Sequence, residues 1–273
     1  MCRGLTILFL LFFPWLVASG FDAGLLPGRD AGYYLVRGNP AAVFCNPAFS
    51  HGTGSFHWVA GVHNHHGIRN YNSLMAGIGT SNPQRAFFLN LKSASLSENE
   101  YHRTLVNLGS NLFIAPGISA GVVIRMMHFR LPAHYGRHTV AGGMAGVKSR
   151  LNTRWDAGLA LGYYQPTATT SKQRDPFTHI LVEVCWKPAA SSSSFALSAE
   201  TVSETSPLVM ATFTTQVIQH VDMMVGVGTG AMQLFAGIRF SAGSIQSAAV
   251  SGFNPLTGIS SSLVLAKPQN QAR

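Results

Sequence analysis

Charged residues are scarce in this 273-residue chain, since Asp, Glu, Lys and Arg together make up 11% of it, against about 25% in ordinary soluble domains. Apolar residues reach 47%. After the first twenty residues, however, no segment has the roughly 18 consecutive apolar residues that a membrane helix needs. These two shortages argue against a highly charged soluble protein and against a helical membrane protein.

Cysteine is also scarce, with three residues in the chain. Cys2 lies in the apolar leader described below, and no cysteine directly follows that leader. Lipoprotein processing, which needs a cysteine at the cleavage site, is therefore not expected. Cys45 and Cys185 either pair in an oxidising compartment or stay as two separate thiols. No repeated cysteine spacing indicates a disulfide framework or a zinc site.

The first twenty residues have the pattern of a secretory signal peptide. Arg3 gives a positive start, residues 5–17 are almost all apolar, and Ala18-Ser19-Gly20 supplies small residues for cleavage. A membrane anchor is the alternative, but the apolar core is short and Pro14 interrupts it. We therefore expect residues 1–20 to be removed and the protein to be exported.

From residue 54 on, the chain alternates apolar and polar residues with a period of two, whereas residues 21–53 lack sustained alternation. In TRWDAGLALGYYQ, residues 153–165, Trp155 and Tyr163 end one apolar face, while Asp156 shares the other face with Gly and Ala. The two aromatic residues are about 27 Å apart along a strand, or roughly 20 Å in depth at a 45° tilt. This approximates the apolar band between the aromatic girdles of a membrane barrel. A soluble β-sandwich, which also alternates, is the alternative.

The sequence thus predicts an all-β fold, a transmembrane antiparallel β-barrel of about fourteen strands, with twelve possible. Residues 21–53 are expected to form an N-terminal plug segment, residues 54–266 the barrel and residues 267–273 a polar tail. The expected strands are 54–65, 71–80, 84–96, 102–114, 117–130, 137–151, 153–165, 177–188, 193–204, 207–219, 221–230, 232–243, 245–253 and 256–266.

Two sets of side chains follow from the alternation. An aromatic girdle at the membrane interfaces is predicted for Trp58, Trp155, Tyr163 and Trp186. Polar side chains facing the lumen are predicted for Arg125, Lys148, Arg150, Arg154, Glu183, Lys187 and Arg239. The lumen-facing set either holds a plug through an internal network or forms a selectivity ring for anionic solutes.

The segment before the first expected strand contains Asn-Pro-Ala twice, as Asn39-Pro40-Ala41 and as Asn46-Pro47-Ala48. Asn and Pro favour turns and the first residues of short helices. The segment is therefore either a loop before the barrel or a plug inside it.

No pattern supports catalysis or a cofactor. His57, His63, His65 and His66 are the densest histidine cluster, but His-x-His alone is a weak metal signal. No Gly-x-Ser-x-Gly element is present, and acidic residues number only ten. We expect a protein that is not an enzyme, without metal or cofactor. The net charge of +9 indicates contact with something acidic, such as lipopolysaccharide or an acidic protein, while export argues against nucleic acid.

The Asn-Pro-Ala element before a glycine-rich barrel resembles the FadL-type outer-membrane proteins. The stretch NPAFSHGTGSFHWVAGVHNHHGIRNYNSLMAGIG and later strands such as AGVKSRLNTRWDAGLALGYYQP are more similar to the PorV/PorQ-like branch of Bacteroidota, which is associated with type IX secretion. The likeness covers residues 39–166, and the chain departs from that branch in its short loops and in lacking a terminal aromatic residue.

The resemblance implies an outer membrane of a Gram-negative bacterium as the location. It also implies a non-enzymatic accessory subunit that binds other outer-membrane proteins in a complex for type IX secretion, barrel assembly or nutrient uptake. The alternative is a FadL-like transporter of hydrophobic small molecules. A third possibility is a barrel that organises membrane lipid or lipopolysaccharide alone.

Overall fold

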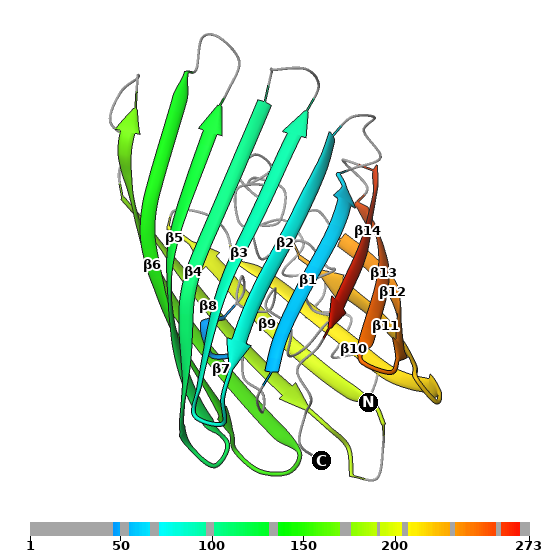
Figure 1. The fold of residues 1–273 in the computed structure, drawn as a ribbon. Helices are drawn as coiled ribbons and strands as arrows, with labels where there is room; N and C mark the ends of the chain where they lie inside the picture. The colour runs from blue at the N-terminus through cyan, green and yellow to red at the C-terminus, as the bar shows by residue number, and fades with distance from the viewer. Residues whose placement is uncertain are drawn as a thin grey trace, which may run out of the picture.

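The chain forms a closed antiparallel β-barrel in the computed structural model, which describes residues 46–49, 55–65, 71–96, 101–130, 136–169, 176–189, 192–203, 207–229, 233–254 and 258–267. Each strand pairs with the next along the chain, and the first strand pairs with the last (Figure 1). The strands are β1 (Ser55–Asn64), β2 (Tyr71–Ser81), β3 (Arg85–Leu96), β4 (Tyr101–Ala115), β5 (Ile118–Arg130), β6 (Arg137–Arg150), β7 (Trp155–Thr169), β8 (Phe177–Trp186), β9 (Ser194–Val202), β10 (Leu208–Ile218), β11 (Val221–Gly228), β12 (Gln233–Ala242), β13 (Ile245–Asn254) and β14 (Gly258–Lys267). The predicted barrel of about fourteen strands is confirmed.

The two ends of the barrel differ in their connections. At one end, which we call the tight-turn end, β4, β10 and β12 are joined to the following strands by the turns 116–117, 219–220 and 243–244. The opposite end, called the loop end, is at the top of Figure 1. Outer-membrane barrels have short turns on the periplasmic side and longer loops outside. By this criterion the tight-turn end faces the periplasm.

Local side-chain chemistry forms the tight turns. The Asn82 side-chain oxygen accepts hydrogen bonds from the backbone N–H groups of Gln84 and Arg85 at 2.9 and 2.8 Å. Such an Asx turn reverses the chain before a strand begins. Gly117 has φ of 81°, a left-handed conformation that glycine adopts without steric cost.

Burial alternates along the strands, most regularly on β5. On β5, Arg125 is fully buried, whereas its neighbours Ile124 and Met126 are 70% and 49% exposed. The exposed side chains are the large apolar ones, so the outer face of the barrel is apolar and the polar residues point inward. A soluble sandwich would bury these apolar side chains. The closed hydrogen-bonded sheet and its apolar outer face place the protein in an outer membrane.

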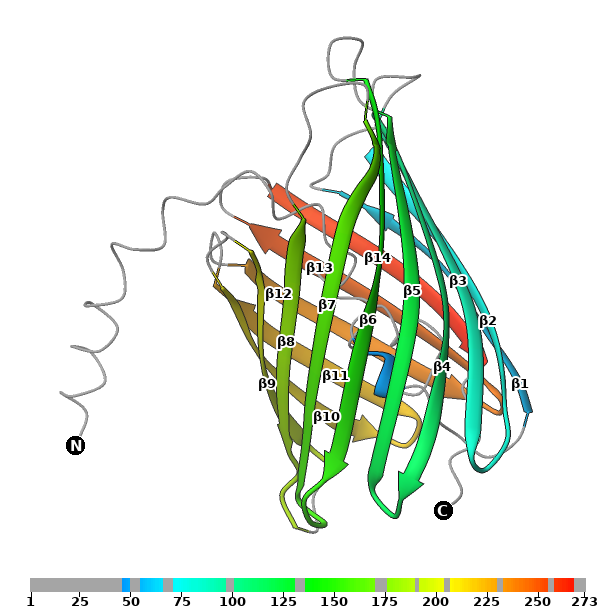
Figure 2. The same ribbon diagram turned by 90° about the vertical axis from the view of Figure 1, so that its left-hand side faces the viewer.

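The barrel is taller on one side. Strands β4 to β7 are 15, 13, 14 and 15 residues long, whereas β8, β9 and β11 have 10, 9 and 8. In Figure 2, β6 and β7 rise above β8 and β9 at the loop end. The extra height is at the end of β7, since β8 pairs with residues 155–164 and residues beyond Tyr164 pair only with β6.

One short helical element lies inside the barrel. The 3-10 helix η5 (Pro47–Phe49) is the blue segment enclosed by the strands in Figure 2. Its contacts are with the inner face of β4, β5 and β6. Within the described ranges, no helix is long and apolar enough to cross a membrane.

A charge on the outer face of β5 tests the membrane assignment. Ile124→Lys should destabilise the folded barrel by roughly 2–4 kcal/mol, because a cation near the bilayer midplane loses its hydration. Gln165→Lys, an exposed position at the edge of the apolar band, should cost roughly 0–1 kcal/mol. Denaturant titration in phospholipid bilayers measures both. Equal stability of the two variants would show that Ile124 faces water.

Candidate functional site: the barrel interior

The interior of the barrel has two chemically different halves. Among the described residues, every fully buried side chain on β11 to β14 is apolar. They are Met224, Phe235, Ala248, Val250, Val264 and Ala266. The buried polar side chains lie instead on β1 to β10 and just after β1. They are His57, His65, Ser73, Asn90, Lys92, Arg103, Asn107, Asn111, Ser119, Arg125, His138, Asp156, His179, Ser198, Glu200 and Thr212. The buried side chains are therefore all apolar on β11 to β14 and mixed on β1 to β10, and we call these two sides the apolar half and the polar half of the lumen. The apolar half also carries partly buried polar groups, namely the ion pair of Arg239 with Asp222 and the side chain of Gln246.

The second Asn-Pro-Ala motif is bound to the polar half. The Asn46 side-chain amide donates to the backbone carbonyls of Val147 and Leu159 at 3.5 and 3.3 Å. Its oxygen accepts from the Ala48 backbone N–H at 2.9 Å, which closes the turn on itself. Asn46 and Ala48 are both fully buried. The Asn46 side chain thus connects the turn of the motif to β6 and β7.

Two strand side chains hold the motif from the other side. Asn111 Nδ2 on β4 donates to the Pro47 carbonyl at 3.2 Å, and Ser119 Oγ on β5 donates to the Ala48 carbonyl at 2.9 Å. Both strand residues are buried. Four strands therefore contribute hydrogen bonds to three consecutive residues, close to the tight-turn end.

Two inward glycines make room for this contact. A Cβ at Gly146 would lie 2.0 Å from the Asn46 side-chain oxygen, and one at Gly121 would lie 2.4 Å from the Pro47 carbonyl oxygen. Real Cβ atoms do not approach other heavy atoms so closely, so either side chain would push the motif off the strands. Glycine at these positions is required by the close approach of Asn46–Ala48.

A buried arginine lies farther from the tight-turn end. Arg125 on β5 donates through Nε to the Asn107 side-chain oxygen and through Nη1 to the Tyr164 hydroxyl, both at 2.9 Å. The Tyr164 ring stacks on Phe177 with centroids 5.1 Å apart. Burying a guanidinium is costly unless it is hydrogen-bonded, and these partners on β4 and β7 supply bonds to both sides of Arg125.

Inward aromatic rings lie flat against the wall because each faces a glycine on the neighbouring strand. Tyr164 is the register partner of Gly142, and a Cβ there would be 2.6 Å from the ring. Two phenylalanines repeat this arrangement on other strands, in the pairs Phe88 with Gly109 and Phe235 with Gly226. The absence of a Cβ lets each ring cover its partner instead of pointing to the centre of the lumen.

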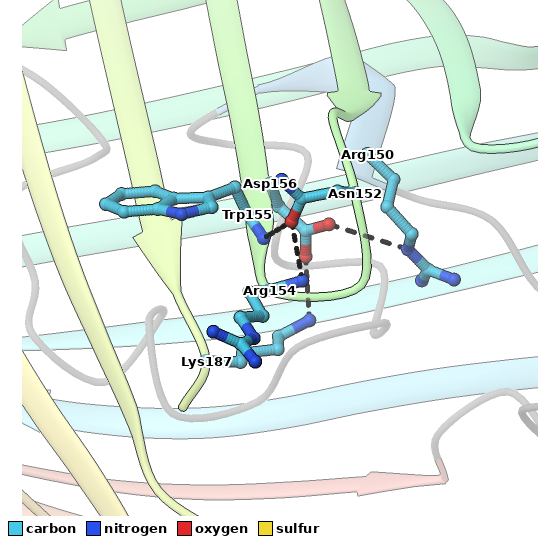
Figure 3. A network of polar contacts seen from close by, with 6 residues as sticks. All are labelled: Arg150, Asn152, Arg154, Trp155, Asp156 and Lys187. Atoms are coloured by element: carbon cyan, nitrogen blue, oxygen red, sulfur yellow. Dashed lines mark hydrogen bonds and ion pairs between the residues drawn. The ribbon is translucent and has the colours of Figure 1, made fainter. Parts of the chain in front are cut away.

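A second polar network lies at the tight-turn end of β6, β7 and β8 (Figure 3). Asp156 accepts from Lys187 Nζ at 2.7 Å, and its other oxygen is 3.5 Å from Arg150 Nε. The Asp156 side chain is 9% exposed, while those of Lys187 and Arg150 are 40% and 61% exposed. The buried carboxylate of Asp156 thus interacts with two partly exposed cations, Lys187 and Arg150, at this end of the barrel.

The predicted lumen-facing residues occupy different places. Inward positions on their strands are occupied by Arg125, Lys148, Glu183 and Arg239. Arg239 on β12 donates through Nε to Asp222 Oδ2 on the neighbouring strand β11 at 2.8 Å. Arg150 ends β6 and Lys187 directly follows β8, so both belong to the tight-turn end.

The prediction for Arg154 was wrong. It was expected near the start of a strand covering 153–165, but it is an exposed residue of the turn 151–154 (Figure 3). The reason is an Asx turn, in which the Asn152 side-chain oxygen accepts from the N–H groups of Arg154 and Trp155 at 2.8 and 3.0 Å. This delays the start of β7 to Trp155.

The predicted girdle residues lie on the outer face. Trp155 and Trp186 are register partners with ring centroids 6.3 Å apart, and they are 41% and 39% exposed. Tyr163 is 54% exposed at the other end of the β7 apolar face, and Trp58 is half-exposed on β1. Their role as an interfacial girdle stays a prediction.

Some predictions concern residues outside the described ranges. These are the signal peptide, residues 21–45 of the predicted plug segment with the first motif (Asn39, Pro40, Ala41) and Cys45, His66, and residues 268–273 of the predicted polar tail. Cys185 is buried in β8, and its pairing with Cys45 stays open. His63 and His65 stack edge-on with centroids 4.2 Å apart, but in the described part of the chain no three His, Cys, Asp or Glu side chains are grouped as metal ligands.

Sequence reasoning missed several interior residues. Lys92 and Arg103 are 2% and 4% exposed near the loop end, and Asn107, Asn111 and Tyr164 make the contacts described above. Their signal was present, because each has the inward parity of its strand. What the alternation did not reveal was which inward residues of different strands meet.

Displacing the second Asn-Pro-Ala motif tests its contact with the strands. Gly146→Ala should destabilise the bound motif by about 1–3 kcal/mol, because the new methyl group overpacks the site. Hydrogen exchange of the peptide covering residues 46–49 should therefore become faster. Gly252→Ala is the matched control, since its Cβ would meet nothing closer than 3.6 Å. Equal exchange in both variants would contradict the contact.

Comparisons with known proteins identify the fold. The toluene transporter TbuX of Ralstonia pickettii superimposes with a TM-score of 0.61 at 9% identity, covering 85% of this chain and 94% of that one. The CymD monoaromatic hydrocarbon channel has a TM-score of 0.59 at 10% identity, covering 94% and 99%. A Pseudomonas aeruginosa FadL homologue has a TM-score of 0.50 at 11% identity, covering 92% and 98%.

Neither a protein-family model nor a curated protein matched the sequence. At identities near 10%, similarity to solved structures is evidence of shared fold only. This chain therefore has the barrel fold of FadL-type outer-membrane proteins.

Proposed function

We propose that this protein is a channel that lets hydrophobic small molecules cross the outer membrane. The observation that carries the proposal is the apolar half of the lumen, formed by β11 to β14. A water-filled porin has a polar interior, whereas a lumen whose buried side chains are apolar on one side offers a hydrophobic molecule contacts that water cannot replace. The similar structures named above, TbuX and CymD, are a toluene transporter and a hydrocarbon channel.

The two halves of the lumen have separate tasks in this proposal. The polar half binds the Asn-Pro-Ala motif and positions Arg125, so it fixes the internal segment. The apolar half is free of such anchoring side chains among its fully buried residues, and it supplies the surface along which the solute moves. Because the buried side chains on that side are apolar and its Arg239 is paired with Asp222, the channel favours solutes by hydrophobicity and not by charge.

The accessory-subunit hypothesis remains a prediction. It depended on the shortness of the loops, and nothing in the part of the barrel that the structure describes specifically favours a protein partner. Gentle extraction from the native membrane separates the two hypotheses. A barrel recovered with stoichiometric outer-membrane partners supports the accessory role, and a monomer supports an independent channel.

Uptake of a hydrophobic probe tests the proposed channel. The full-length protein is placed in the outer membrane of cells whose lipopolysaccharide excludes hydrophobic compounds. Uptake of N-phenyl-1-naphthylamine should rise, while uptake of a hydrophilic sugar stays unchanged. A parallel rise of both solutes would indicate a water-filled porin, and no rise of either would reject transport.

A substitution on the apolar half makes the test specific. Val264 is 2% exposed and inward-facing on β14, where its register partners are Ala248 and Gly61, so Val264→Asn puts an amide into the apolar half. Probe uptake should fall by about fivefold or more, because an unpaired amide there costs roughly 1–3 kcal/mol. Ser198→Asn, on β9 in the polar half, is the matched control and should keep uptake unchanged. Equal effects of both variants would contradict an apolar path.

A further inference from the structure

A buried histidine and a buried glutamate meet on the inner face of β8 and β9. His179 Nε2 is 2.8 Å from Glu200 Oε1, and the two side chains are 1% and 5% exposed. His179 is close to the start of β8 and Glu200 is close to the end of β9. The pair therefore lies in the polar half of the lumen near the loop end, on the side where the barrel wall is low (Figure 2).

The second ring nitrogen of His179 is buried without a hydrogen bond. Its Nδ1 has no hydrogen-bond partner in the described part of the chain, and Nε2 faces Glu200. A buried polar atom that makes no hydrogen bond destabilises the fold, so native structures contain few of them. The Nδ1 atom therefore points to a ligand that supplies the missing bond.

The hydroxyl of Tyr164 lies beside this imidazole. Gly162 is the register partner of His179, and a Cβ at Gly162 would be 3.1 Å from the Tyr164 hydroxyl oxygen. That oxygen accepts from Arg125 Nη1 at 2.9 Å, so the hydroxyl keeps its own proton to donate. Neighbouring strands thus present two hydrogen-bonding groups at one place, His179 Nδ1 and the Tyr164 O–H.

The surroundings of these two groups are apolar. The register partners of Glu200 are Leu181 and Leu208, which are 3% and 4% exposed. Phe177 stacks on the Tyr164 ring with centroids 5.1 Å apart. Sites for small molecules are mostly apolar, with a few polar groups that fix the orientation of the ligand. These side chains therefore suit a ligand that is hydrocarbon except for one polar group.

A hydroxyl group matches the two hydrogen-bonding groups. If the proton of a neutral His179 ring is on Nε2, toward Glu200, then Nδ1 accepts, whereas in the imidazolium form Nδ1 donates. A hydroxyl can donate and accept, so it bonds Nδ1 in either form and still accepts from the Tyr164 O–H. A carboxylate is disfavoured, because Glu200 brings a like charge next to the ring.

We propose that His179 and Tyr164 select hydrophobic solutes that carry one hydroxyl group, such as alkylphenols. The hydroxyl lies on the polar half, and the hydrocarbon part contacts Leu208 of β10 and the apolar half beyond it. The loop end faces away from the periplasm, so an entering solute meets this site first. The inference rests on the proposed channel and names its class of solute.

Binding of matched solutes by the full-length protein in lipid nanodiscs tests the selection. Isothermal titration calorimetry, with empty nanodiscs as the reference, compares 4-ethylphenol, ethylbenzene and 4-ethylbenzoate at about pH 7, where the phenol is neutral. Wild type should bind 4-ethylphenol about tenfold more tightly than ethylbenzene, because the hydroxyl supplies bonds that the buried groups otherwise lack. It should bind 4-ethylbenzoate more weakly than the phenol.

Substitutions assign the preference to these side chains. Tyr164→Phe removes only the hydroxyl and should reduce the preference for the phenol severalfold. His179→Phe combined with Glu200→Leu removes the imidazole without leaving a buried unpaired carboxylate, and it should abolish the preference. The matched control is His57→Phe, which replaces another buried inward histidine, packed over Gly79 on β2, and should keep the preference. Heat-modifiable migration in electrophoresis checks that each barrel is folded.

Equal binding of 4-ethylphenol and ethylbenzene by wild type would overturn the proposal, since water alone would then satisfy the two groups. Benzoate binding as tight as that of the phenol would also overturn it, because the site would then be an anion site. So would loss of the preference in His57→Phe, or a preference that persists in the folded double variant. None of these results depends on uptake of N-phenyl-1-naphthylamine, so the channel and its selectivity can fail separately.

Discussion

Every backbone polar group of a sheet in hydrocarbon needs a partner within the sheet, because lipid offers none. This constraint makes closure obligatory. Trp58–Asn64 of β1 pairs with Ser261–Lys267 of β14, joining segments from opposite ends of the chain. Once the sheet is closed, one face of each strand meets lipid and the other meets the interior of the barrel. The period-two alternation of the strand sequences follows from that difference. The apolar exterior and the polar interior are therefore two consequences of one hydrogen-bonded ring.

Closure with fourteen strands also creates an interior space that side chains of the strands do not fill completely. Eight strands leave a space that side chains just fill, and larger barrels enclose a cavity or channel. Here the chain fills part of the space with its own Asn-Pro-Ala segment, which requires glycine at positions 121 and 146. The same residue type opposite Phe88, Tyr164 and Phe235 keeps these rings against the wall. Inward glycine thus serves both to admit a backbone segment and to keep aromatic rings away from the axis.

The fold, and the side of the barrel wall to which each side chain points, were predictable because both depend on the local alternation of apolar and polar residues. In a strand such as Ile118–Arg130, the alternation of apolar and polar residues alone indicates which side chains face lipid. The strand count followed from the number of segments with that pattern. The interior contacts were not predictable, because they depend on register between strands. Nothing near Asp156 in the sequence shows that Lys187, 31 positions away, reaches its carboxylate. Arg154 was misplaced for a local reason, since the Asx turn at Asn152 competes with strand formation.

The tall and short sides of the barrel correspond to the two chemistries of its interior. Strands β4 to β7 are long and carry most of the side chains that hold the Asn-Pro-Ala segment. Strands β11 to β14 are shorter, and their buried side chains are apolar, with Val264 and Ala266 inside and Leu263 and Leu265 exposed outside. Because the Asn-Pro-Ala segment is bound to the long strands, the buried apolar side chains of the short strands are left as the surface along which we propose that a hydrophobic solute moves.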